Sequence, residues 1–192
     1  GHARGAPHKA GRMDKEQRSQ DLKKAKQLIT GQDFAAAFEL LRAVSSPDDD
    51  FTAQHRYASL FKLIPEGALA LKPVNIAFAA TSTIEHFIEV FRFWCALEGF
   101  YIRHYLAEFN TLHQSVLDPS SGLYASQPEI VWLFTGHRDA GADVPPGAPD
   151  GDVDAAVASA VGSFTKLWGA LRANSGAYII QNNADLPLSR VF

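Results

Sequence analysis

Four short apolar runs constrain the fold of this chain more than any other feature. The runs cover residues 74–80, 100–109, 130–135 and 178–181. Runs of this length are typical of strands in a parallel sheet that is covered on both faces. Helical patterns at 83–98 and 153–173 precede the second and fourth runs, and such crossovers join parallel strands. The pattern therefore predicts a three-layer α/β/α sandwich with a mainly parallel sheet.

The residues before the first run have a different pattern. Residues 1–12 lack a periodic apolar pattern, and we expect them to be a disordered tag or leader. In residues 13–72, apolar side chains recur every three or four positions in three segments, which is typical of amphipathic helices. We therefore expect a small helical N-terminal cap over residues 13–72 and an α/β domain over residues 73–192.

Composition excludes several classes of protein. Hydrophobic residues make up 46% of the chain and charged residues 20%, which is too apolar for a disordered protein. The net charge of -3 at pH 7 offers no general attraction to nucleic acid or anionic lipid. The single cysteine, Cys95, forms no internal disulfide and lies in an apolar helical segment, where we expect an inert thiol. Because no apolar run is long enough to span a membrane, we expect a cytoplasmic protein without nucleic-acid or membrane partners.

Polar residues follow three of the apolar runs, and these are the candidate site residues. Ligands of an open α/β sheet bind at the carboxyl ends of its strands. The residues at these positions are Thr81, Ser82, Thr83, Gly136, Arg138, Asp139 and Asn182. Ser82 stands between a strand and a helix, where a serine nucleophile or an anion-binding hydroxyl could lie. We therefore assign Ser82 as the candidate catalytic residue and the others as candidate ligand-binding residues.

Several of these residues also have a structural interpretation. Residues 82–85 have the spacing of a capping box, in which a serine and a glutamate satisfy the first backbone donors of a helix. His137 and Asp139 could form an acid–base pair or lie in a solvated turn. His86 and His104 show no metal-ligand spacing with an acidic residue. We therefore expect no metal site and no cofactor in this chain.

Several short motifs occur in an order and spacing that are more specific than any motif alone. The motifs are GQDFAAA (31–37), NIAFAATST (75–83), EGFY (98–101), AEFN (107–110), LDPSSGLY (117–124), QPEIV (127–131) and NNADLP (182–187). Together they make residues 31–192 similar to the N-terminal region of FkbH-like proteins. This family belongs to the HAD-superfamily phosphatase and glyceryltransferase proteins of polyketide-type biosynthesis.

The resemblance implies a fold like that of SGNH hydrolases, which is flavodoxin-like, normally followed by a HAD domain with an Asp-x-Asp-x-Thr/Val motif. In full-length relatives, the HAD domain converts 1,3-bisphosphoglycerate into a glyceryl thioester on an acyl carrier protein. No such motif occurs in the sequence up to Phe192. The resemblance therefore implies Mg²⁺ only together with a HAD domain.

Compared with SGNH hydrolases, Ser82 stands at the nucleophile position, but the surrounding residues depart from the pattern. Thr81 replaces the preceding Asp, and Arg138 stands where the Asn of the oxyanion hole is expected. The C-terminal Asp-x-x-His is missing, since the last histidine is His137. A serine without its base is a poor nucleophile, and loss of one oxyanion donor lowers the rate by about 10²–10³. Hydrolase activity is therefore disfavoured, and only a histidine from beyond Phe192 would restore the pattern.

These observations favour a non-catalytic recognition or docking domain. The expected partners are an acyl carrier protein or the adjacent HAD domain, during loading of a three-carbon unit. Carrier proteins are usually acidic, so Lys23, Lys24 and Lys26 could bind one, although a solvated helix face explains these lysines equally well. The alternatives are a serine esterase or acyltransferase that uses Ser82, and a small-anion or phosphosugar site at the strand ends.

Overall fold

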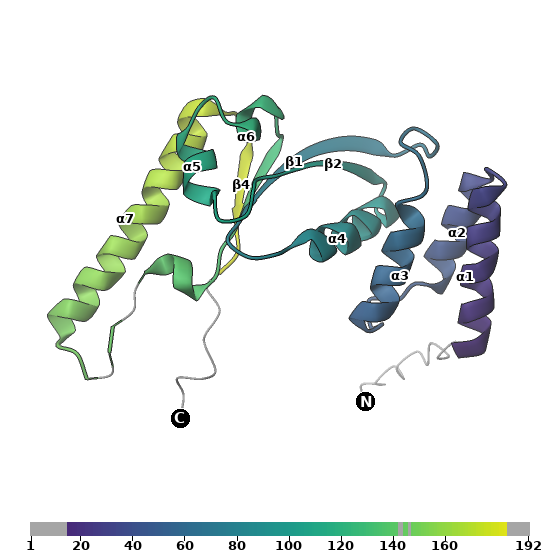
Figure 1. Ribbon diagram of the computed structural model, residues 1–192, viewed down its shortest axis with the longest axis horizontal. Coiled ribbons are helices and arrows are strands. Elements are labelled where there is room, and N and C mark those ends of the chain that lie inside the picture. The colour runs from purple at the N-terminus through teal and green to yellow at the C-terminus, as the bar shows by residue number, and fades with distance from the viewer. Residues whose placement is uncertain (1–14, 142–143, 146, 184–192) are drawn as a thin grey trace, which may run out of the picture. The chain divides into compact units, whose positions relative to one another are not determined.

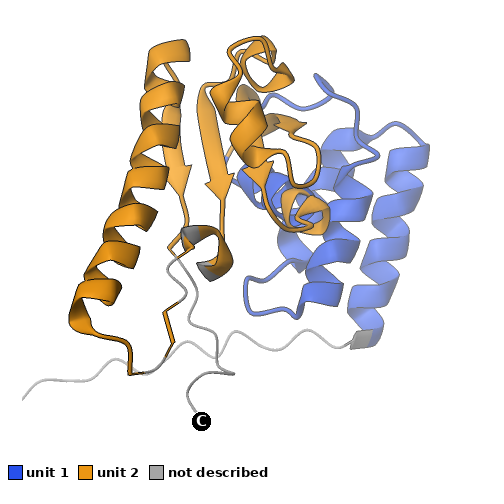
Figure 2. Cartoon of the chain, turned by 60° about the vertical axis from the view of Figure 1, so that its left-hand side comes forward, with its two compact units in different colours: residues 1–71, 89–98 blue, residues 72–88, 99–192 orange. Residues whose placement is uncertain are grey.

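The computed structural model describes residues 15–141, 144–145 and 147–183, so the expected leader at 1–12 lies outside the described residues. The chain divides into two compact units, which Figure 2 colours blue and orange. The first unit comprises residues 1–71 and 89–98, and the second comprises residues 72–88 and 99–192. One continuous helix, α4 (Glu85–Leu97), begins in the second unit and ends in the first. The division into domains at residues 72 and 73 stays a prediction.

The second unit is built on a four-stranded parallel sheet (Figure 1). Its strands are β1 (Lys72–Ala80), β2 (Phe100–Leu106), β3 (Ile130–Phe134) and β4 (Tyr178–Gln181). They lie in the order β2-β1-β3-β4, and every neighbouring pair is parallel. The last five residues of β1 are all buried, as the apolar run at 74–80 predicts for a central strand. The predicted α/β fold class and its four strands are confirmed.

Helices flank this sheet. After β2 and β3 the chain forms α5 (Leu112–Leu117), α6 (Gly122–Ala125), the 3-10 turn η1 (His137–Ala140) and α7 (Asp150–Asn174). The core of the unit joins β1 and β3 to α5, α6 and α7, and includes Ala77, Ala79, Leu112, Val116, Leu123, Val131, Leu133, Leu167 and Leu171. Phe87, at the start of α4, contacts Trp132 and Phe134, with ring centroids 5.5 and 5.2 Å away. None of the described helices is both long enough and apolar enough to span a membrane.

α7 is only partly buried, which corrects the stripe that its sequence predicts. The expected buried stripe comprises Val157, Val161, Phe164, Leu167, Trp168 and Leu171. In the structure Leu167 and Leu171 are buried, whereas Val157 and Val161 are 52% and 56% exposed. The 25 residues of α7 extend over about 37 Å, but a five-residue strand spans only about 17 Å. The N-terminal half of α7 therefore extends beyond the carboxyl ends of the strands, as Figure 2 shows.

Two short helices flank the segment that the sequence predicts to be a loop around residues 118–122. Asp118 holds the turn between them by accepting hydrogen bonds from the Ser120 hydroxyl and N–H, at 2.7 and 2.9 Å. At Gly122, an added Cβ would lie 2.7 Å from the Tyr105 hydroxyl oxygen, so that glycine fits this close approach. Helices of six and four residues are too short to show a period in the sequence.

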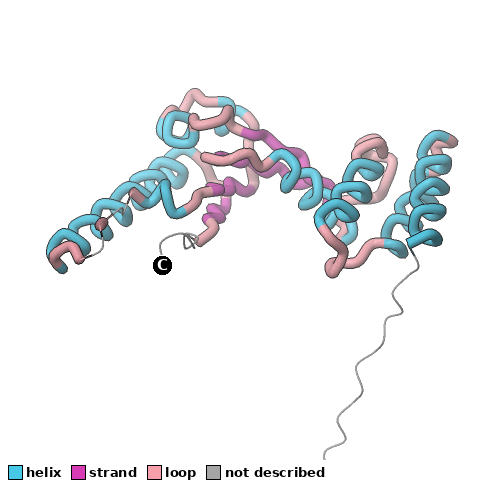
Figure 3. Tube along the Cα trace, turned by 60° about the horizontal axis from the view of Figure 1, so that its bottom comes forward, coloured by secondary structure: helices cyan, strands magenta, loops and turns pink. Residues whose placement is uncertain are grey.

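The first unit contains the expected N-terminal helices, together with the second half of α4. They are α1 (Lys15–Thr30), α2 (Phe34–Val44) and α3 (Phe51–Phe61). Asp33 and Asp50 cap α2 and α3, because each carboxylate accepts a backbone N–H three residues later, at 3.2 and 2.8 Å. The buried aromatic side chains of the unit are Phe38, Tyr57, Phe61 and Phe93. Figure 3 shows this unit as helices and loops, with the strands confined to the other unit.

A largely buried carboxylate joins the helices of the first unit. The side chain of Asp49 is 10% exposed and accepts hydrogen bonds from Arg18 Nη1 at 2.6 Å and from the Tyr57 hydroxyl at 2.7 Å. The N–H of Ser46 also donates to this carboxylate, at 3.1 Å. Burial would raise the pKa of the Asp49 carboxyl, but the hydrogen bonds it accepts outweigh burial and lower it. Burial and the bond to Asp49 raise the pKa of Tyr57 to about 12.

Candidate functional site

The candidate site lies where the direction of the sheet's connections reverses. The chain leaves β1 for β2 on one side and later returns to β3 on the other side. Ligands of open α/β sheets bind at such a switch point, at the carboxyl ends of the strands. A pocket of about 530 Å³ lies there, lined by Thr81, Ser82, Asn110, Phe134, Thr135, Gly136, Arg138, Asp139, Asn182 and Asn183.

The structure brings together all the candidate site residues except Thr83, which does not line the pocket. Binding by these residues stays a prediction. Thr135 and Asn183 also line the pocket, next to the predicted Gly136 and Asn182, whereas the strand-end pattern did not indicate Asn110 or Phe134. Asn110 adopts a left-handed backbone conformation with φ of 62°, which asparagine tolerates and which no sequence pattern indicated here.

Asp139 ties the end of β1 to the turn after β3. Its Oδ2 accepts hydrogen bonds from the Thr81 hydroxyl at 2.7 Å and from the Gly136 N–H at 2.7 Å. The Gly136 N–H therefore already has an acceptor. Asp139 therefore fixes the positions of Thr81 and Gly136 at the pocket. An acid–base pair of Asp139 with His137 stays a prediction.

Asn182 joins the ends of β3 and β4. Its Oδ1 accepts the Thr135 N–H at 3.0 Å, and its Nδ2 donates to the Thr135 carbonyl. The neighbouring Gln181 donates to the Thr135 hydroxyl at 3.2 Å and accepts from Trp168 Nε1 at 2.6 Å. The oxygen and the nitrogen of the Asn182 amide both already have hydrogen-bond partners on Thr135. Asn182 therefore holds the ends of β3 and β4 together at the edge of the pocket.

Ser82 is exposed, and the predicted capping box is wrong. α4 begins at Glu85, three residues after Ser82, whereas a capping box requires the serine directly before the helix. The reason is that Thr81 is still held at the sheet, since its N–H donates to the Phe134 carbonyl at 3.4 Å. Ser82 lines the pocket, and its hydroxyl makes no hydrogen bond with any described residue.

The charged groups of the pocket are a guanidinium and a carboxylate. Among the described side chains that line it, Arg138 and Asp139 are the charged ones and none is an imidazole. Arg138 is exposed and forms no ion pair with the part of the chain that the structure describes. A guanidinium beside a hydroxyl can bind an anionic group, but it cannot take a proton from serine.

The thiol of Cys95 does not belong to a reactive site. Cys95 is half-buried on α4, and burial together with the nearby charge of Glu98 raises its pKa to about 11. A thiol with so high a pKa is almost entirely protonated near neutral pH, and the protonated form is a poor nucleophile. This agrees with the inert thiol that the apolar sequence around Cys95 predicts.

The comparisons with known proteins identify a structural likeness and no sequence family. No protein-family model matches the sequence, and no curated protein matches it. Among solved structures, the chain is similar to the N-terminal part of the protein BF1531 from Bacteroides fragilis, which contains a phosphatase domain and is complexed with Mg. The TM-score is 0.55 at 15% sequence identity, and the match covers 74% of this chain and 35% of that chain. At this identity the likeness shows the fold, which is that of a region in a phosphatase-domain protein.

Proposed function

We propose that this chain is a non-catalytic recognition domain of a cytoplasmic FkbH-like protein. In this proposal, an adjacent phosphoryl-transfer domain of the HAD type makes glyceryl-acyl carrier protein from 1,3-bisphosphoglycerate. The present chain orients the carrier protein or the adjacent domain. The observation that carries the proposal is the pocket at the strand ends, which holds an exposed guanidinium and hydroxyl but no imidazole among its described side chains.

The geometry of the pocket favours binding over catalysis. Ser82 has no imidazole among the described lining side chains, and the Gly136 N–H already donates to Asp139. Among the described lining residues, Ser82 therefore has neither an imidazole base nor a free Gly136 N–H that could serve as an oxyanion donor. Arg138 and Ser82 can instead hold a phosphate or carboxylate of a bound group by hydrogen bonds.

The likeness to the N-terminal part of a protein with a phosphatase domain also supports this proposal. The solved part of that protein contains a phosphatase domain. The present chain covers about a third of that protein chain, so its partnership with a phosphoryl-transfer domain belongs to the proposal. Sequencing the gene downstream of Phe192 for an Asp-x-Asp-x-Thr/Val motif tests this part directly.

α1 offers a surface for an acidic carrier protein. Lys23 and Lys26 line a surface hollow of about 420 Å³ together with Gln27 and Thr30, and Lys24 is exposed beside them. Positive charge on a docking rim accelerates and strengthens the binding of an acidic partner, and salt weakens this effect.

Reversing these charges should abolish most of the binding. We expect Lys23→Glu with Lys26→Glu to weaken the affinity for the carrier protein encoded beside the gene by about tenfold or more at low salt. Titration calorimetry at two salt concentrations measures this. The matched control is Lys166→Glu, which changes an exposed lysine on α7. An equal loss in the control, or no binding of any neighbouring carrier by the unmodified chain, contradicts the docking surface.

The second candidate function is a serine esterase or acyltransferase, favoured by the exposed Ser82 hydroxyl at the pocket. A fluorophosphonate probe separates the two functions, since it labels serines that a base has activated. We expect no labelling above that of Ser82→Ala at equal protein concentration. Labelling that disappears in Ser82→Ala would establish an active nucleophile and exclude the non-catalytic proposal.

A further inference from the structure

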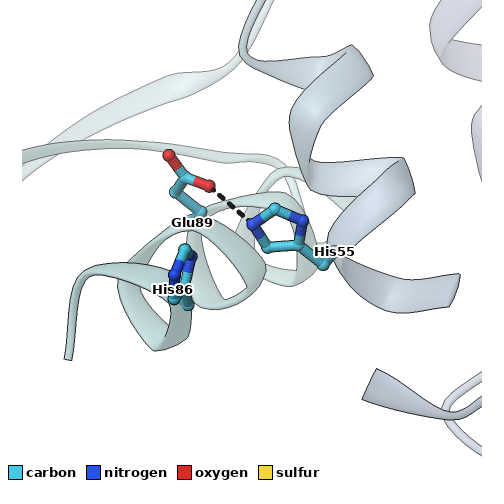
Figure 4. A group of neighbouring side chains, drawn as sticks. All are labelled: His55, His86 and Glu89. Carbon is cyan, nitrogen blue, oxygen red and sulfur yellow. Dashed lines mark ion pairs between the residues drawn. The ribbon is translucent and has the colours of Figure 1, made fainter. Parts of the chain in front are cut away.

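Arg138, at the strand-end pocket, is a cationic side chain without an anionic partner among the described residues. In the helical unit, by contrast, the Glu89 carboxylate lies 2.6 Å from Lys62 Nζ and 3.1 Å from His55 Nε2, and Figure 4 shows the second of these pairs. Arg138 is exposed and makes neither an ion pair nor a side-chain hydrogen bond with the part of the chain that the structure describes. Its guanidinium is therefore available to an anionic group of a ligand.

A second donor at this pocket is almost completely buried. Thr135 is 5% exposed and lines the pocket. Its hydroxyl oxygen accepts a hydrogen bond from Gln181 Nε2 at 3.2 Å, so the hydroxyl proton still needs an acceptor of its own. None of the described residues supplies this acceptor, although buried polar groups in proteins are usually hydrogen-bonded. A ligand in the pocket can supply it.

Ser82 adds a third donor, and the three together suit a phosphate group. The Ser82 hydroxyl lines the same pocket and makes no hydrogen bond with the described residues. A carboxylate has two oxygens, and the two parallel N–H groups of one guanidinium can pair with both. A phosphate monoester has three terminal oxygens, so it can accept from a guanidinium and from two hydroxyls at once.

The remaining polar groups of the pocket suit the hydroxyls of a ligand. Asp139 Oδ2 accepts from Thr81 and Gly136, whereas Oδ1 accepts no hydrogen bond from the described residues. The side-chain amides of Asn110 and Asn183 also line the pocket, and each offers both donors and an acceptor. A ligand hydroxyl can donate to the carboxylate or pair with an amide. The Asp139 carboxylate repels an anion that has no hydroxyl to donate to it.

We propose that the strand-end pocket binds a small polyhydroxylated molecule that carries one phosphate group, as a sugar phosphate does. The phosphate accepts from Arg138, Ser82 and Thr135, and the hydroxyls pair with Asp139 and the amides. The pocket volume of about 530 Å³ lies within the range of about 300–1,000 Å³ that is usual for small-molecule sites. All the residues that line it belong to the second unit. The inference rests on the proposed function, because it takes this pocket as a site of binding and not of catalysis.

Titration calorimetry of the full chain with ribose 5-phosphate, in a buffer without phosphate, tests the proposal. We expect one equivalent to bind, and Arg138→Gln should weaken the affinity by about tenfold or more, because a charged donor to the phosphate is lost. Ser82→Ala removes a neutral donor and should weaken the affinity by a smaller factor, about threefold. The matched control is Arg172→Gln, which changes an exposed arginine on α7 outside the pocket and should leave the affinity unchanged.

Three further ligands separate the parts of the proposal. Ribose, which lacks the phosphate, should not bind measurably. Ribonate, which carries a carboxylate, and inorganic phosphate, which carries no hydroxylated chain, should both bind more weakly than ribose 5-phosphate. The proposal is overturned if about 10 mM ribose 5-phosphate gives no binding, since that limit corresponds to an interaction weaker than that of most specific ligands. It is also overturned if inorganic phosphate or ribonate binds as tightly, or if Arg138→Gln binds as tightly as Arg172→Gln.

These measurements need no carrier protein, so they separate this inference from the proposed function. Absence of ribose 5-phosphate binding overturns the inference and leaves carrier docking on α1 to its own test. Fluorophosphonate labelling of Ser82 overturns the proposed function, whatever the calorimetry shows.

Discussion

Replacing Phe93 by alanine should destabilise the helical unit by about 3–5 kcal/mol, which is the usual effect of removing a fully buried phenylalanine. Phe93 is 0% exposed and contacts the rings of Tyr57 and Phe61, with centroids 5.9 and 6.1 Å away. Alanine removes these contacts and leaves a cavity that rigid neighbours fill only in part. Urea unfolding followed by circular dichroism measures the change in the free energy of unfolding.

The control for this experiment is Phe51→Ala in the same unit. Phe51 is 57% exposed at the start of α3, so its truncation should change the stability by less than about 1 kcal/mol. If Phe93→Ala loses no more stability than Phe51→Ala, the aromatic cluster around Phe93 is not the core of this unit.

Replacing Asp49 by asparagine should destabilise the same unit by about 3 kcal/mol at neutral pH, because it leaves Arg18 and the Tyr57 hydroxyl without their charged acceptor. The effect should depend on pH. The pKa of Asp49 is lower in the folded chain than in the unfolded chain, so its stabilising effect is complete above the unfolded value of about 3.9 and is lost as the pH falls through the lower folded value.

Unfolding of both proteins between pH 7 and pH 3 measures this dependence. The difference in the free energy of unfolding should be largest at pH 7 and should shrink towards pH 3. Asp48→Asn is the matched control, since Asp48 is the exposed neighbour of Asp49. A difference between Asp49→Asn and the unmodified chain that stays constant over this range would contradict the charged role of Asp49.

The fold could be predicted because its strands are buried on both faces. Residues 76–80 of β1 are all buried, so the strand reads as an unbroken apolar run, and the same holds in part for β3. Local periodicity also located the three N-terminal helices, whose ends are set by capping residues such as Asp33 and Asp50. The burial of α7 could not be predicted, because the apolar spacing continues through Val157 and Val161 although these residues lie beyond the strands and are exposed.

The candidate site could be predicted only as a set of strand ends. Parallel strands bring their carboxyl ends to one edge, and this placed Thr81, Arg138 and Asn182 around one pocket. The hydrogen bonds that the side chains of the site make join residues far apart in the sequence. Asp139 and Thr81 are 58 residues apart, and their hydrogen bond could not be read from local spacing.

The extension of α7 past the strands divides this helix into parts of unequal local stability. The turns around Leu167 and Leu171 are held by the core, whereas the turns around Val153 and Val157 depend mainly on their own backbone hydrogen bonds. Backbone amides in the first half should therefore exchange with deuterium much faster than those in the second half. Gly162, at the middle of the helix, has a low helix propensity and weakens the first half further, so fraying from the N-terminus should reach this residue.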